Sequence, residues 1–121
     1  MGKALIVDDS STEREIISKY LTQLGINISI AKSGEEALEK IKSDIPDLIV
    51  LDVVLPGRSG FEICREIKAE GATSKIPVII CSTKGTEMDK FWGMKQGADA
   101  YLPKPIDQEE FIRTVKQLIK A

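Results

Sequence analysis

The sequence predicts an α/β fold in which a parallel sheet is covered by helices on both faces. Two observations lead to this prediction. Short apolar runs alternate with amphipathic helical patterns five times along the 121 residues, and the connections between them are short. Strict alternation of this kind favours parallel strands joined by right-handed crossovers. We therefore expect one domain over residues 1–121, since 42% apolar and 30% charged residues are typical of an ordinary folded core.

The strands are expected at the short apolar runs, which are rich in β-branched residues. The third run is continuous and apolar up to Asp52, so it should be a central strand that is buried on both faces. The second run alternates apolar and polar residues and should be less buried. The five expected strands are 3–7, 26–31, 48–52, 76–81 and 100–102.

Each helix is expected to begin at a Ser, Thr or Asp that is followed three residues later by an acid, which is the pattern of a helix N-cap. The pairs are Ser10 with Glu13, Ser33 with Glu36, Ser59 with Glu62, Thr86 with Asp89, and Asp107 with Glu110. The three serine pairs predict reciprocal capping boxes. The fourth helix has the least regular pattern, because Gly93 lies inside it and costs about 1 kcal/mol relative to Ala.

Composition excludes several classes of protein. The net charge is −2 and both signs are mixed along the chain, which argues against a nucleic-acid partner. No apolar run approaches the roughly 20 residues that span a bilayer, so we expect no membrane association. Cys64 and Cys81 are widely separated and are expected to be reduced core residues of a cytoplasmic protein. The chain contains no histidine, which removes histidine bases and histidine metal ligands.

Polar residues follow the expected strands at the point where each strand ends. They are Asp8 and Asp9, Asp52, Ser82 and Thr83, and Lys104. Because the carboxyl ends of parallel strands share one edge of a sheet, these side chains should meet in one crevice. Carboxylates that share a crevice repel each other unless a cation joins them, and oxygen ligands without His or Cys favour Mg²⁺. A carboxylate nucleophile, a metal, a lysine and a hydroxyl donor together suit phosphoryl transfer onto Asp52.

The sequence resembles the response-regulator receiver domains of the CheY-like family over essentially its whole length. The matching stretches are VDDSS (7–11), LDVVLPGRSGFE (51–62), PVIICST (77–83) and GADAYLPKP (97–105). The resemblance implies a flavodoxin-like (βα)5 three-layer sandwich with strand order 2-1-3-4-5. Within the family, the stretch STKGT (82–86) together with FWGMKQGA (91–98) is most similar to the stand-alone receivers of pilus-based motility systems.

The family also implies roles for individual residues. Asp52 would accept a phosphoryl group from a phosphohistidine on a sensor histidine kinase or phosphotransfer protein. Asp9, Asp52 and the backbone carbonyl of Val54 would hold Mg²⁺, and Asp8 would support the metal through water. Lys104 would bind the phosphoryl oxygens and precede a cis proline, Pro105.

Ser82 and Tyr101 would be the switch residues. In the family, the hydroxyl at the position of Ser82 moves toward the phosphoryl group, and the aromatic ring at the position of Tyr101 changes its rotamer. The helix 4, strand 5, helix 5 face would then bind a target protein, and we expect a monomer. The domain would be a signalling phosphoacceptor rather than an enzyme. Val54 cannot orient a water, which predicts slow loss of the phosphoryl group. Trp92 is more readily explained as a packing residue than as a contact.

Three alternative classes of protein share parts of this pattern of residues. A phosphatase or mutase with an aspartyl nucleophile would need a second acid where Val54 stands. A flavodoxin-type FMN carrier would need a hydroxyl- and glycine-rich loop after the first strand, where Asp8 and Asp9 would repel a phosphate. A receiver-like module that binds without phosphorylation usually lacks a key residue, and none is missing here. A phosphorelay shuttle or a phosphate sink would have the same sequence as a switch.

Overall fold

The computed structural model describes residues 2–119, in which strands and helices alternate along the chain as the sequence predicts. The strands are β1 (Gly2–Val7), β2 (Ile26–Ala31), β3 (Leu48–Leu51), β4 (Val78–Ser82) and β5 (Ala100–Pro103). The helices are α1 (Ser11–Gln23), α2 (Gly34–Ser43), α3 (Gly60–Ala69), α4 (Glu87–Lys95) and α5 (Gln108–Leu118). No described helix is long and apolar enough to cross a membrane.

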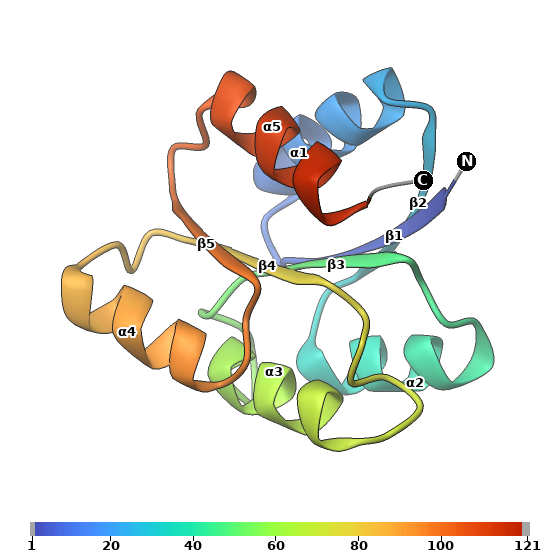
Figure 1. Ribbon diagram of the computed structural model, residues 1–121, viewed down its shortest axis with the longest axis vertical. Coiled ribbons are helices and arrows are strands. Elements are labelled where there is room, and N and C mark those ends of the chain that lie inside the picture. The colour runs from blue at the N-terminus through green and yellow to red at the C-terminus, as the bar shows by residue number, and fades with distance from the viewer. Residues whose placement is uncertain (1, 120–121) are drawn as a thin grey trace.

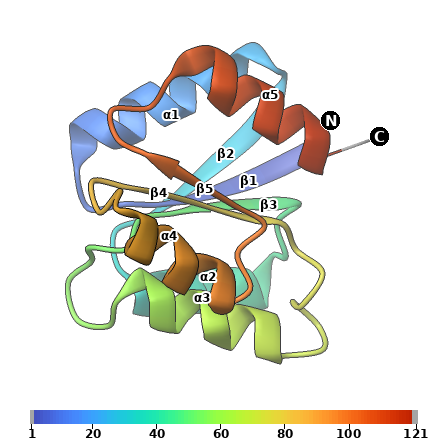
Figure 2. The ribbon, with the colours of Figure 1, turned by 60° about the vertical axis from the view of Figure 1, so that its left-hand side comes forward.

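All strand pairs are parallel, and the sheet has the order β2-β1-β3-β4-β5. Helices α1 and α5 cover one face of the sheet, and α2, α3 and α4 cover the other (Figures 1 and 2). The predicted three-layer, flavodoxin-like architecture with order 2-1-3-4-5 is therefore confirmed. The chain runs from β1 outward to β2 and then returns to β3 on the other side of β1, which makes the boundary between β1 and β3 the switch point of the topology.

The central strands are buried on both faces, so the core has two halves separated by the sheet. Every residue of β3 and of β4 is buried, which explains their continuous apolar runs. On the α1 and α5 side the core includes Ile17, Leu21 and Phe111. On the other side α2 and α3 contribute Ile41 and Ile63. The ends of the buried strands β1, β3 and β4 carry polar residues that are discussed below.

The helices begin where the sequence predicts, but the capping bonds differ in detail. In all five helices the N-cap side chain accepts a hydrogen bond from the backbone N–H three residues on. The three predicted serine capping boxes are wrong in their second half, because only Thr86 and Asp89, among the described helices, form the reciprocal pair. Asp8 accepts from the N–H of Ser10 instead, and Glu36 accepts from the N–H of Lys32.

Candidate functional site

The strand register places the polar residues at the same edge of the sheet. Val7 pairs with Leu51, so that Asp8 and Asp52 leave adjacent strands at the same level. Ser82 pairs with Pro103, and the N–H of Lys104 donates to the carbonyl of Ser82 at 2.9 Å. The predicted crevice thus forms at the carboxyl ends of the strands, beside the switch point of the topology.

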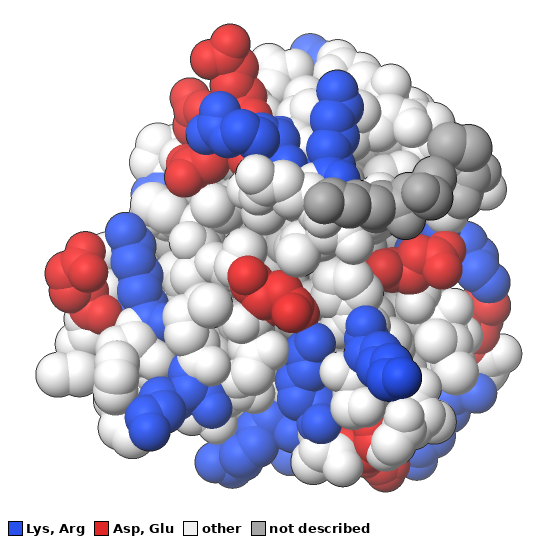
Figure 3. Space-filling model, viewed as in Figure 1, with Lys and Arg blue, Asp and Glu red and all other residues white. Residues whose placement is uncertain are grey.

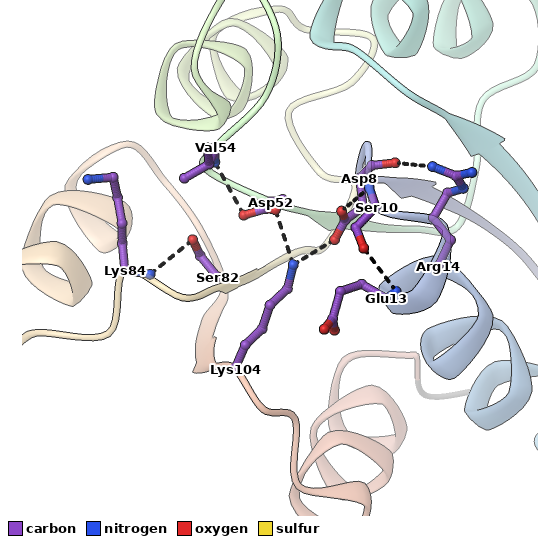
Figure 4. Close-up of polar contacts among 9 residues, drawn as sticks. All are labelled: Asp8, Ser10, Glu13, Arg14, Asp52, Val54, Ser82, Lys84 and Lys104. Atoms are coloured by element: carbon purple, nitrogen blue, oxygen red, sulfur yellow. Dashed lines mark hydrogen bonds and ion pairs between the residues drawn. The ribbon is translucent and has the colours of Figure 1, made fainter.

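Asp52 lies just after β3, and its backbone N–H donates to the carbonyl of Val7 at 2.9 Å. The residue is 7% exposed. Its Oδ1 accepts a hydrogen bond from the N–H of Val54 at 3.2 Å, which orients the carboxylate into the crevice (Figure 4). Val54 itself is 51% exposed, so its side chain faces solvent beside the buried carboxylate.

Helix α3 begins against the backbone of Asp52, and this close approach requires a glycine. The N–H of Gly60 donates to the carbonyl of Val53 at 2.9 Å. A Cβ at Gly60 would lie 2.0 Å from the carbonyl oxygen of Asp52, which is far inside van der Waals contact. The contact is with backbone atoms that cannot rotate away, so Gly60 is part of what positions Asp52.

Lys104 joins the two buried carboxylates of the crevice. Its Nζ lies 2.7 Å from Oδ2 of Asp8 and 3.1 Å from Oδ2 of Asp52 (Figure 4). Burial by itself would lower the pKa of Lys104, but the hydrogen bond that it donates to Asp8 and the negative charge of Asp52 outweigh burial and raise the pKa above its usual value. The side chain is therefore a permanent cation here. The Lys104–Pro105 bond is cis, as the resemblance implies.

Asp8 is held in place by three partners. One of its carboxylate oxygens binds Lys104, and the other accepts from the N–H of Ser10 at 2.9 Å. Its backbone carbonyl accepts a hydrogen bond from the guanidinium of Arg14 at 2.9 Å. Arg14 was not predicted as a site residue. Its position one turn into the helix after Asp8 is the only signal that the sequence offers.

The acidic cluster has the composition of a metal site. Asp8, Asp9 and Asp52 each offer a carboxylate oxygen, and these oxygens all lie within 4.8 Å of one another. Asp8 and Asp52 are buried, whereas Asp9 is exposed. Three carboxylates without a nitrogen or sulfur ligand fit a hard divalent cation such as Mg²⁺, and Lys104 compensates only part of their charge.

Ser82 is fully buried at the end of β4, and it is connected to Tyr101 through the backbone of Lys84. The Ser82 hydroxyl oxygen accepts from the N–H of Lys84 at 3.2 Å, and the Tyr101 hydroxyl donates to the carbonyl of Lys84. Burial, followed by the charges of Asp89 and Asp52, raises the pKa of Tyr101 to about 12, so its hydroxyl stays a donor. Thr83 is exposed at the rim of the crevice.

The remaining predicted residues lie outside the crevice. Cys64 and Cys81 are buried free thiols, as expected. Burial raises the pKa of the Cys81 thiol and raises that of Cys64 to about 11, so neither is a reactive thiolate. Trp92 keeps 52% of its surface exposed on α4 and packs edge-on against Phe91, so it is not a core residue.

The fold and the site define a class of protein: a flavodoxin-like α/β domain with an acidic, lysine-containing crevice at its switch point. The chain belongs to the response regulator receiver domain family, whose pattern it matches over residues 4–116. It is thus a receiver domain of the kind found in two-component signal transduction.

Individual relatives agree with this assignment. The chain is 39% identical to Protein PilH of Pseudomonas aeruginosa, with 98% of each chain covered. It is similar to a response regulator from Chloroflexus aurantiacus, with a TM-score of 0.93, 34% identity, and 97% and 96% of the two chains covered. It is also similar to CheY4 of Vibrio cholerae, with a TM-score of 0.90, 30% identity, and 98% and 99% covered. The chain spans about half the length of the response regulator MprA of Mycolicibacterium vanbaalenii, to which it is 35% identical.

Proposed function

We propose that Asp52 is the phosphoacceptor of this receiver and that phosphorylation changes the surface formed by α4, β5 and α5. The observation that supports this most directly is the buried ion-paired triad. Lys104 lies within hydrogen-bond distance of both Asp8 and Asp52, and Asp9 completes a cluster of three carboxylates. Burial of charge is costly unless it is compensated, and one lysine compensates only part of the charge of these carboxylates, so the crevice favours a further cation.

Each residue of the crevice has its own role in phosphoryl transfer. The Asp52 carboxylate attacks phosphorus, and the bond from phosphorus to the leaving nitrogen or oxygen of the donor breaks. Lys104 exchanges its bond with Asp52 for one with a phosphoryl oxygen, which compensates the added charge. Asp8, Asp9, Asp52 and the carbonyl of Val54 would hold Mg²⁺, which supplies positive charge to the transferring oxygens. The Ser82 hydroxyl oxygen accepts from the N–H of Lys84, and its own proton can donate to the bound group.

A phosphohistidine donor must lie outside this stretch of sequence, because residues 1–121 contain no histidine. A sensor histidine kinase or a phosphotransfer protein is the natural partner of a receiver domain. The 39% identity to PilH supports a place in pilus-based motility. We expect the domain to act as a monomeric signalling switch in the cytoplasm rather than as an enzyme.

The test is phosphorylation by acetyl phosphate, followed by intact mass soon after mixing and over time. We expect the wild type to gain one phosphoryl group when Mg²⁺ is present and none when it is chelated. Asp52→Asn should gain none. Asp44→Asn is the matched control, because Asp44 is an exposed acid that pairs with Lys3 on the surface, and it should behave as the wild type does.

Modification of Asp52→Asn to the same extent as the wild type would show that Asp52 is not the acceptor. If the wild type gains no phosphoryl group, a beryllofluoride titration followed by Trp92 fluorescence separates a short-lived phosphate from a module that binds without phosphorylation. A saturable, Mg²⁺-dependent response supports the first, and no response supports the second.

A further inference from the structure

Helix α4 is unusual because its largest apolar side chains face solvent. Met88, Phe91 and Trp92 are spaced as the buried stripe of an amphipathic helix, yet they are 64%, 54% and 52% exposed. The buried residue of the helix is Gly93. Figure 3 shows uncharged atoms over the outer side of α4, at the left of the view, with charged side chains around them. The helix therefore rests on the sheet through a position that carries no side chain.

The ring of Tyr101 occupies the space that a side chain at position 93 would take. A Cβ at Gly93 would lie 2.5 Å from Cδ2 and 2.7 Å from Cε2 of Tyr101, and 3.3 Å from Cδ1 of Ile80. The ring of Tyr101 thus lies directly against the backbone of α4. A glycine inside a helix is unfavourable by about 1 kcal/mol relative to Ala, so its presence here calls for a compensating contact.

The hydroxyl of the same tyrosine is connected to the crevice by hydrogen bonds. Its hydroxyl donates to the carbonyl of Lys84, and the N–H of Lys84 donates to the hydroxyl oxygen of Ser82. One residue of the β4–α4 loop therefore contacts the buried hydroxyl through its N–H and the tyrosine through its carbonyl. A continuous chain of contacts runs from Ser82 through Lys84 and Tyr101 to Gly93.

We propose that Gly93 is a positioning residue. Because it has no side chain, the Tyr101 ring packs against the α4 backbone at this position, which we call the seat of the ring. Through this contact Ser82 is coupled to the exposed stripe of Met88, Phe91 and Trp92. The contact between Gly93 and Tyr101 stands on the structure alone. Its use as a link to phosphorylation rests on the function proposed above for Asp52 and Ser82.

The consequence is specific to this glycine. An alanine at position 93 favours the helix, but its Cβ would overlap the ring of Tyr101. The ring can move away, because a tyrosine side chain can change its rotamer. The variant Gly93→Ala should therefore fold, with Tyr101 moved out of its seat and its bond to Lys84 lost. Gly71→Ala is the matched control, since a Cβ at Gly71 has nothing within 4 Å.

The seat is tested without phosphorylation. In a Tyr20→Phe background Tyr101 is the single tyrosine, and NMR should show a contact between its ring protons and the α-protons of Gly93. Gly71→Ala should keep this contact. A double-mutant cycle with Tyr101→Ala gives a second measure. The Tm change caused by Gly93→Ala should be more favourable when Tyr101 is absent, because the helix then gains the alanine without a collision. Equal Tm changes in both backgrounds, or no ring contact in the wild type, would overturn the proposal.

The coupling is tested with beryllofluoride and Mg²⁺. ¹⁹F NMR measures the binding of beryllofluoride at the site, and Trp92 fluorescence reports a change in the surroundings of the α4 stripe. Gly93→Ala should still bind beryllofluoride but lose the fluorescence response, whereas Gly71→Ala should keep both. An unchanged response in Gly93→Ala would overturn the coupling and leave the role of Asp52 intact. A wild type that binds no beryllofluoride would instead count against the function proposed for Asp52, and the NMR contact and the Tm cycle would still decide whether Gly93 seats the ring.

Discussion

Replacing Lys104 by methionine should destabilise the protein strongly and make its stability depend more strongly on Mg²⁺ than that of the wild type does. The Lys104 side chain is 6% exposed, and those of its partners Asp8 and Asp52 are 2% and 9% exposed. Methionine keeps most of the apolar stem but removes the cation between two buried carboxylates. The two negative charges then face each other without compensation.

The size of the effect follows from this burial. Removal of one partner from a buried ion pair costs about 3–5 kcal/mol, because the remaining charge stays desolvated. A domain of this length has a free energy of unfolding of roughly 6–18 kcal/mol, so Lys104→Met should remain folded but lose a large fraction of its stability. A cation that binds the carboxylates should restore part of it. At a Mg²⁺ concentration of about 100 times its Kd, the gain is about 2.7 kcal/mol.

The assay is urea unfolding at pH 7, followed by far-UV circular dichroism, with EDTA or with Mg²⁺. We expect the variant to gain more from Mg²⁺ than the wild type does, because Lys104 competes with the metal for the oxygens of Asp8 and Asp52. Lys42→Met is the matched control, since Lys42 is exposed on α2, and its stability should stay within about 0.5 kcal/mol of the wild type.

A loss below about 1 kcal/mol in EDTA, together with a Mg²⁺ response no larger than that of the wild type, would refute the reasoning. That result would mean that the crevice is hydrated enough to tolerate both carboxylates without Lys104. The ion pairs would then contribute as little as ordinary surface pairs do.

Three further predictions concern a buried thiol of the core, the glycine behind Asp52 and the exposed valine beside the site. Stability should fall between about pH 9 and about pH 11, because burial raises the pKa of Cys64 to about 11 while the same thiol ionises near its ordinary value in the unfolded chain. Each pH unit in this window should cost about 1.4 kcal/mol per such thiol, and urea unfolding of Cys64→Ala should show a shallower decline. Gly60→Ala should lose about 3 kcal/mol or more in thermal unfolding, since its Cβ would overlap the Asp52 carbonyl, whereas a soluble variant with unchanged Tm would contradict that packing. Val54→Asn should shorten the lifetime of the phosphoryl group, measured by intact mass, and an unchanged lifetime would show that the exposed Val54 does not limit water attack.

Much of the fold was predictable because its signals are local. Continuous apolar runs marked the buried strands, and a Ser, Thr or Asp three residues before an acid marked all five helix starts. The reciprocal capping bonds were not predictable. Whether Glu13 or Glu36 returns a bond depends on which other acceptors and donors lie nearby: Asp8 accepts from the N–H of Ser10 in place of Glu13, and the N–H of Lys32 donates to Glu36.

The candidate site likewise has residues that the sequence predicts and residues whose roles depend on tertiary packing. Asp8, Asp52 and Lys104 could be placed together from the sequence, because the ends of parallel strands share one edge of the sheet whatever the packing. Arg14 could not, since its bond to the carbonyl of Asp8 depends on the angle at which α1 leaves β1. Nor could the requirement for glycine at position 60, which reflects how closely α3 approaches the Asp52 backbone.

The sequence by itself determined the order of the elements, the identity of the charged residues at the strand ends and the family to which they belong. Only the tertiary structure decided which face of α4 points outward. The spacing of Met88, Phe91 and Trp92 indicates an apolar stripe, but periodicity is the same for a stripe that faces a core and for one that faces solvent. Here the ring of Tyr101 packs against Gly93, so the sheet side of α4 is taken by a glycine and the apolar side chains face the water.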